Sequence, residues 1–218
     1  CIRRALNETA RQYLEYAQTN DVNFQSDIIT LPTGDGAAVI FSFDGLHDIH
    51  LYFAQMLLKE AHAIQRASPC EKFIQQGWCN CHSNFNVRIG LSEGKGIIYR
   101  DMNSGYNIAG SVINIASRVM GFGDSQQIVF TEEAYRQIID MVDDPYFIDH
   151  FTEFRDITIK HGVKINIYQF TDSDIDYLNS APPSELELQT RSNQVMNNLK
   201  ASGFSIPDLE SLETASKE

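Results

Sequence analysis

Apolar and polar residues follow two different periods along this chain, which predicts helices and strands in mixed order. Spacing typical of amphipathic helices runs over residues 2–18, 45–67, 111–123 and 131–139. Apolar runs typical of strands occupy residues 27–31, 37–43, 85–91, 96–100 and 126–130, and residues 153–170 read as strand, turn and strand. This order predicts an α+β or α/β fold, in which helices flank a sheet.

Two local signals support these boundaries. Thr131 precedes Glu132 and Glu133, which is typical of a helix start, because a hydroxyl accepts from backbone N–H groups and carboxylates favour the positive helix end. Gly34-Asp35-Gly36 separates two apolar runs and predicts a β-hairpin. Taken alone, Asp35 is more simply a turn residue than a metal ligand.

Composition separates residues 1–170 from a C-terminal extension. Residues 171–218 are rich in Ser, Asn and Glu, and we expect a solvated extension with one helix over 184–200. The whole chain has 218 residues and 43% hydrophobic residues, enough for one core. Its formal charge of −12 argues against binding long nucleic acid, although not against a single nucleotide. No apolar run is long enough to span a membrane, and no signal peptide is visible.

Cys70, Cys79 and Cys81 gather in an irregular segment over residues 68–84, while Cys1 stands apart. This is not the spaced framework of a secreted disulfide scaffold, so we expect a cytoplasmic protein. With Cys70, the sequence CNCH at 79–82 offers four soft ligands to zinc. The Cys-x-Cys spacing is tighter than usual and the adjacent Cys-His pair makes joint ligation awkward, which favours unligated thiols.

Four segments resemble the class III nucleotidyl cyclase catalytic domain, and together they cover roughly residues 1–170. They are TGDGAAVIF (33–41), VRIGLSEGKGII (87–98), YNIAGSVINIASRVM (106–120) and ITIKHGVKINIYQF (157–170). The resemblance implies a ferredoxin-like α+β fold with a mixed sheet. It also implies a cyclase that converts a nucleoside triphosphate to a 3′,5′-cyclic nucleotide and pyrophosphate, using two divalent ions, Mg²⁺ or Mn²⁺, about 3.5–4 Å apart.

The same resemblance assigns roles to individual residues. Asp35 matches the second of the family's two metal-binding aspartates. Asn114 matches the residue that positions the ribose, and Arg118 matches the one that stabilises the transition state. Lys160 matches a lysine that binds the terminal phosphates, with Lys164 as a nearby alternative. In this family the metals and the asparagine–arginine pair come from different protomers, so a homodimer is implied.

The family's first metal-binding aspartate has no counterpart in these residues. The family's spacing, counted back from Asp35, places it before Cys1, so we expect an N-terminal strand to be missing from this sequence. On this interpretation, residues 1–218 alone are nearly inactive.

The positions that select the base also depart from the family. Adenylate cyclases carry lysine four residues before the hairpin aspartate and aspartate seven before the catalytic asparagine; here these positions are Leu31 and Asn107. An apolar Leu31 cannot donate to a purine, whereas the Asn107 amide both donates and accepts. With the segment GIIYRDMNSGYNIAGSVIN (96–114), this is similar to the bacterial pyrimidine cyclases of antiphage defence, whose product activates a separate effector. UTP is favoured over CTP, and the alternatives are an adenylate cyclase or a non-catalytic regulatory domain.

Overall fold

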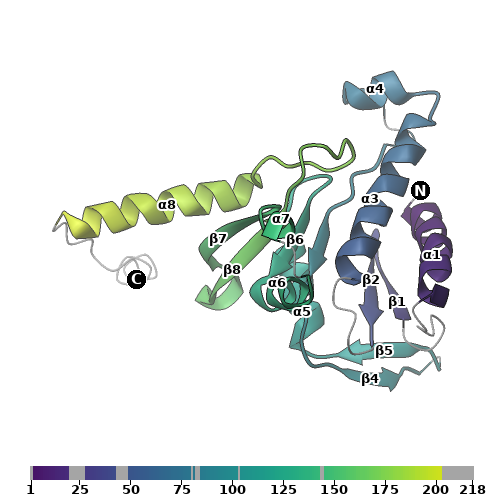
Figure 1. Cartoon of the computed structure of the whole chain (residues 1–218), viewed down its shortest axis with the longest axis horizontal. Coiled ribbons are helices and arrows are strands. Elements are labelled where there is room, and N and C mark those ends of the chain that lie inside the picture. Colours follow the sequence, from purple (N-terminus) through teal and green to yellow (C-terminus); the bar gives the residue numbers. More distant parts are fainter. Residues whose placement is uncertain are drawn as a thin grey trace, which may run out of the picture.

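The computed structural model describes residues 2–19, 28–42, 49–79, 81, 84–102, 104–142 and 145–202 (Figure 1). In chain order its helices are α1 (Ile2–Thr19), α3 (Ile49–Arg66), α4 (Glu71–Gln75), α5 (Ser111–Met120), α6 (Glu132–Met141), α7 (Pro145–Ile148), the short 3₁₀ helix η1 (Lys160–Gly162) and α8 (Ser184–Ala201). Its strands are β1 (Ile28–Thr33), β2 (Gly36–Phe41), β3 (Ile89–Leu91), β4 (Ile97–Arg100), β5 (Tyr106–Ala109), β6 (Ile128–Thr131), β7 (Phe151–Thr158) and β8 (Lys164–Phe170).

A four-stranded sheet in the order β3-β6-β8-β7 forms the centre of the molecule. β3 and β6 are parallel, whereas β8 is antiparallel to both of its neighbours. β1 and β2 form a separate hairpin, and β4 and β5 form a two-stranded ribbon. The predicted mixed sheet with flanking helices is therefore confirmed.

Alternation along β6 directs its side chains to two hydrophobic layers. Ile128 and Phe130 pack with residues of α3 and α6, whereas Val129 packs on the other face with Val119 of α5 and Leu186 of α8. Side chains of a strand alternate between faces, so covering both faces buries every residue of a central strand. All four residues of β6 are indeed buried, which explains why its first three residues are all apolar.

A β-bulge changes this alternation in β7. The register with β8 shifts between Phe154 and Ile157, and Asp156 adopts a φ of 55° within the shifted segment. Because a bulge inserts an unpaired residue, Phe154 and Ile157 both reach the layer that contains Val119 although they are three apart.

The hairpin β1–β2 contains the predicted turn. Its register runs from Ile28 opposite Phe41 to Thr33 opposite Gly36, and Gly34 in the turn has a φ of 74°, which a residue without Cβ adopts at low cost. The apolar face of the hairpin packs on the start of α3, where Ile49 and Phe53 are buried.

The helix starting after Thr131 is confirmed, since Thr131 Oγ1 accepts a hydrogen bond from Ala134 N at 3.3 Å. The helix predicted within 111–123, with Gly121 or Gly123 ending it, is also confirmed, since it ends at Met120 with Gly121 as its C-cap. The prediction of a strand over 85–91 was too long, because only Ile89–Leu91 pairs as a strand. The sequence patterns did not indicate β5, α4 or α7, and residues 45–48 of the predicted second helix lie outside the described residues.

The segment after Thr171 contributes to the core, so the expectation of a solvated extension was wrong for its first part. Leu178 packs with the layer that contains Phe130, and Leu186 of α8 is fully buried in the opposite layer. The helix expected over 184–200 is present as α8. Among the described helices, none combines the length and apolar character needed to cross a bilayer.

Candidate active site

Helix α5, which carries Asn114 and Arg118, is placed by unusually close packing on the sheet. A Cβ atom at Gly90 of β3 would lie 2.5 Å from both Ala116 O and Met120 N, so only glycine allows the helix this near the strand. Val119 on the same helix is fully buried between the sheet and α8, which fixes the rotation of α5 about its axis. The orientation of Arg118 is therefore determined by the core.

Arg118 lines a cavity of about 520 Å³ between α5, the end of β7 and the start of α8. The residues around this cavity are Ser117, Arg118, Gly121, Phe122, Thr158, Ile159, Lys160, Glu185 and Gln189. Arg118 is half-buried, whereas Lys160 in η1 is exposed at the rim. Two cations and one carboxylate thus face the same space, an arrangement that attracts a polyanion such as a phosphate chain.

Helix α8 forms one wall of this cavity and is held in place by side-chain amides. Gln189 Oε1 accepts from Thr158 N at 2.9 Å, and Asn193 Nδ2 donates to Asp156 O at 3.1 Å. Two side-chain amides one helical turn apart thus form hydrogen bonds with backbone groups of β7. At the start of the helix, Ser184 N and Oγ both donate to Asp124 Oδ2, at 2.9 and 2.8 Å. These contacts position Glu185 at the cavity wall.

Asn114 lies one helical turn before Arg118 but is not among the residues that line the cavity. Its side chain is exposed, and Nδ2 is 3.5 Å from Gly110 O, the limit of a hydrogen bond. Residues four apart share a helix face, so a ligand that fills the cavity and extends along α5 would meet Asn114.

Asp35 is exposed at the tip of the β1–β2 hairpin and does not line the Arg118 cavity. Within the described residues, the only group of three or more metal-ligating side chains is formed by cysteines, so Asp35 belongs to no such group. Asp35 fits the role of one ligand of Mg²⁺ or Mn²⁺, because Mg²⁺ is typically held by one or two carboxylates together with substrate phosphates and water.

The two base-selecting positions lie on elements that contact each other. Leu31 is half-buried on β1 opposite Ala38, and Asn107 is half-buried on β5 opposite Tyr99. β5 packs against β1, so the fold brings the strands of these two residues together (Figure 1). Asn107 Oδ1 accepts from Ile108 N at 2.8 Å, and its amide NH₂ is a donor group.

The sequence model of the protein family described as the adenylate and guanylate cyclase catalytic domain matches residues 40–171 of this chain. The chain belongs to this family. The matched part contains Asn107, Asn114, Arg118 and Lys160. It begins at residue 40, so Asp35 at the hairpin tip lies just before it. The matched domain is thus a nucleotidyl cyclase, a lyase whose family uses divalent metal ions.

Solved structures agree with this cyclase fold. The adenylyl cyclase CyaB from P. aeruginosa matches with 19% identity and a TM-score of 0.51, over 82% of this chain and 83% of that chain. The guanylate cyclase domain of RhGC from Catenaria anguillulae, in complex with GTP, matches with 17% identity and a TM-score of 0.50, over 77% and 81%. At such identities the likeness shows the fold alone. A comparison with curated proteins finds no match.

Sequence reasoning missed the contribution of α8 to the cavity of the cyclase domain. Glu185 and Gln189 follow Pro182-Pro183 in a polar segment, and nothing in their spacing indicates a place beside Arg118. Alternating polarity does predict β7, but the bulge that presents its backbone to α8 follows no local signal.

Proposed function

We propose that Arg118 and Lys160 bind the phosphates of a nucleoside triphosphate in their shared cavity, where the 3′-oxygen of the ribose attacks the α-phosphorus in line. The observation that carries this proposal is that residues from α5 and η1 face one anion-attracting space. Arg118 stabilises the charge that develops on the α-phosphoryl oxygens, and Asn114 orients the ribose. Pyrophosphate is the leaving group.

The cavity favours Lys160 over Lys164 as the lysine that binds the terminal phosphates. Lys160 lines the cavity with Arg118, whereas Lys164 does not. When bound, divalent ions supply Lewis-acid activation of the 3′-hydroxyl and neutralise phosphate charge, and Asp35 is the described carboxylate that would hold them.

A second carboxylate would come from a segment outside the described residues. Among those described, β2 pairs only with β1, and β3 pairs only with β6. Each of these strands therefore presents backbone donors and acceptors that an additional strand could satisfy. Helix α3 packs against β3 and also against the β1–β2 hairpin, so both edges lie under one helix.

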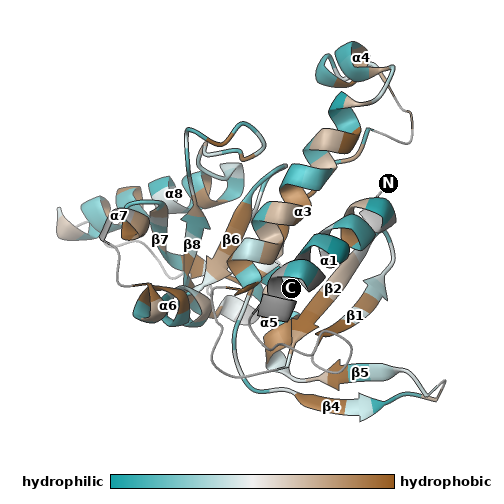
Figure 2. Ribbon diagram, turned by 45° about the vertical axis from the view of Figure 1, so that its right-hand side comes forward, coloured by the Kyte–Doolittle hydropathy of each residue, from teal (hydrophilic) through white to brown (hydrophobic). Residues whose placement is uncertain are grey.

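The complete site requires two protomers in this proposal, arranged head to tail so that Asp35 of one meets Arg118 of the other. The β4–β5 ribbon supports such a homodimer, because it projects from the body with apolar residues in solvent (Figure 2). Ile97, Ile98 and Tyr106 are 72%, 42% and 50% exposed. An exposed apolar surface of this kind is typical of a protein interface.

Leu31 and Asn107 support a pyrimidine substrate, with UTP favoured over CTP. Leu31 offers no donor to a purine nitrogen, and Asn107 offers its NH₂ group as a donor while its oxygen accepts from Ile108 N. An NH₂ donor fits the carbonyl oxygens of uracil better than the amino group of cytosine. With the likeness of residues 96–114 to antiphage cyclases, this supports a second messenger read by a separate effector.

The test is to offer the complete protein ATP, GTP, CTP and UTP with Mn²⁺ and to resolve the cyclic products by mass spectrometry. We expect cyclic UMP to dominate. Cyclic AMP as the sole product would contradict the pyrimidine proposal. No product from any triphosphate would favour a non-catalytic domain.

Mixed dimers test the shared site. Arg118→Ala and Asp35→Asn are each expected to be inactive, but random mixing should restore about a quarter of wild-type activity. Half of the dimers are then mixed, and each has one intact site of two. Mixtures that stay inactive, although mixed dimers are detected by native mass spectrometry, would place both residues in one protomer's site.

A further inference from the structure

The segment between α3 and β3 forms a small projection that we call the cysteine lobe (residues 67–79 and Cys81). None of its described residues is buried, and Phe73 and Trp78 are 54% and 76% exposed. Hydrophobic burial is the main stabilising contribution in folding, so this lobe lacks the usual means of holding a fixed shape.

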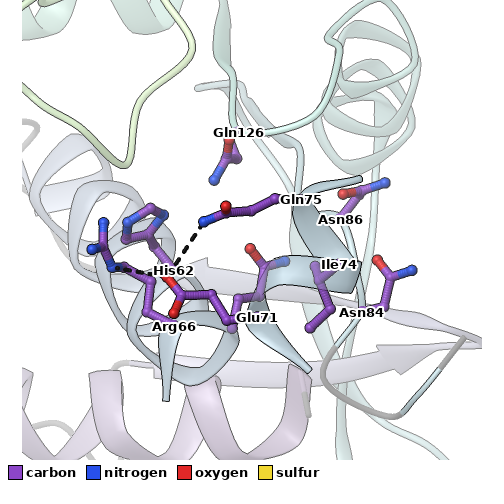
Figure 3. A pocket seen from close by; sticks show the side chains of 9 residues that line it. His62, Arg66, Glu71, Ile74, Gln75, Asn84, Asn86 and Gln126 are labelled. Atoms are coloured by element: carbon purple, nitrogen blue, oxygen red, sulfur yellow. Dashed lines mark hydrogen bonds and ion pairs between the residues drawn. The ribbon is translucent and has the colours of Figure 1, made fainter. Parts of the chain in front are cut away.

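The contact between the lobe and the rest of the molecule is also polar. A pocket of about 250 Å³ separates them, and Figure 3 shows amide side chains from Gln75, Asn84, Asn86 and Gln126 around it. Glu71 accepts from Gln75 at 3.3 Å and pairs with Arg66 at 3.6 Å. Exposed contacts of this kind contribute little, about 0–1 kcal/mol each.

Within the lobe, the Sγ atoms of Cys70, Cys79 and Cys81 lie within 4.8 Å of one another. Cys70 precedes α4, whereas Cys79 and Cys81 follow it, so the cluster joins both ends of the lobe. Cys81 N donates to Cys79 Sγ at 3.4 Å. Asn84 donates from its side chain to Cys79 O and from its backbone N to Cys81 O, the latter at 2.9 Å.

We propose that Cys70, Cys79 and Cys81 bind one zinc ion that fixes the shape of the cysteine lobe. Thiolate sulfur lies about 2.3 Å from zinc, and tetrahedral geometry then separates two sulfurs by about 3.8 Å. The sulfur–sulfur distances therefore need to shorten by about 1 Å or less for all three to bind one ion. The fourth position goes to water or another ligand. Each thiol releases its proton to solvent as its sulfur coordinates the ion.

The arrangement of the sulfurs favours zinc over separate thiols, reversing the preference drawn from sequence spacing. The spacing argument concerned Cys79, Cys81 and His82 as neighbours in the chain. In the structure, Cys70 from the other end of the lobe meets Cys79 and Cys81, so three thiols form a site that does not require the adjacent Cys-His pair to ligate together. The backbone donor on Cys79 Sγ is the type of contact that orients and stabilises a metal-bound thiolate.

The experiment measures zinc in the complete protein after purification with a non-chelating reductant, exposure to Zn²⁺ and dialysis. We expect about one zinc per chain in the wild type and in Cys1→Ser, the matched control. Cys70→Ser, Cys79→Ser and Cys81→Ser should each retain less than about a tenth of that amount. Zinc-free wild type, or wild-type zinc in all three lobe variants, would overturn the proposal.

A second measurement does not depend on the folding of the variants. Wild-type protein loaded with Co²⁺ should show thiolate-to-metal charge-transfer absorption, and added Zn²⁺ should abolish it. Absence of this absorption, or a mass that shows a disulfide within residues 70–81 and no bound metal, would contradict the site. The readout is independent of cyclase activity, so it stands or fails separately from the proposed function.

Discussion

The Arg118 cavity lies on residues buried in the core, whereas the cysteine lobe projects from the end of α3 without a buried residue among those described. Around the cavity, Val119 and Leu186 are fully buried, and Gly90 admits α5 directly onto the sheet. In the lobe, the close contacts are among sulfur atoms and polar groups. One region is therefore positioned by packing and the other by local chemistry.

This difference predicts how each region responds to substitutions. Close packing transmits a change of one methyl group to the position of Arg118, because protein interiors leave few voids. The lobe can change shape without disturbing the core, because its contact with the body is a polar pocket. Substitutions near the cavity should alter activity or global stability, whereas changes in the lobe should remain local.

The largest effect is expected from Arg118→Ala in the complete protein. Removing a cation from the developing charge should lower kcat by about 10²–10³-fold, with little change in thermal unfolding. Steady-state kinetics and a melting curve check this. Arg136→Ala on α6, which removes an exposed arginine paired with Glu132, is the matched control and should keep full activity. Equal losses in both variants would contradict a role specific to Arg118.

The contribution of α8 to the core is tested by Leu186→Ala, which should lower the free energy of unfolding by about 2–5 kcal/mol, because the side chain is fully buried. Leu188→Ala removes the same group two residues later, where it is 65% exposed, and should change stability by less than about 0.5 kcal/mol. Denaturant unfolding compares the two. Equal effects would mean that α8 is not part of the core.

Base selection should respond to restoring the residues of adenylate cyclases. Leu31→Lys with Asn107→Asp adds a donor and an acceptor where β1 meets β5. Contacts of this kind are worth about 1–3 kcal/mol, so the ratio of kcat/KM for ATP to that for UTP should rise by about 10–100-fold. Competition assays with both triphosphates measure the ratio. The control Thr30→Lys, at an exposed position on the same strand, should leave it unchanged.

The smallest global effect is expected from removing zinc from the cysteine lobe. The melting temperature should shift by less than about 2 °C, because no hydrophobic core is lost with the lobe. Proteolysis within residues 67–81 should nevertheless become faster, since local opening needs less energy than global unfolding. Limited proteolysis with and without a chelator checks this, and Cys81→Ser should resemble the chelated wild type. A large drop in melting temperature would contradict the separation of the two regions.

Much of the fold could be predicted because its signals are local. The turn at Gly34-Asp35 and the cap at Thr131 depend on a few neighbouring residues, and both were confirmed. β5 was missed because four residues carry too weak a pattern. The length of β3 was overestimated because the alternating apolar residues begin at Phe85, before its first paired residue, Ile89. The roles of Asp35, Asn114, Arg118 and Lys160 stay predictions.

The sequence by itself determined the family, the mixed order of helices and strands and the residue types that carry phosphate chemistry, because these depend on periodicity and motifs within short windows. Only the tertiary structure decided that Lys160 shares a cavity with Arg118, that α8 closes one wall and that Cys70 meets Cys79 and Cys81. Such contacts join residues far apart in the chain. They depend on how the sheet, the β7 bulge and the packed helices fit together, which no local pattern encodes.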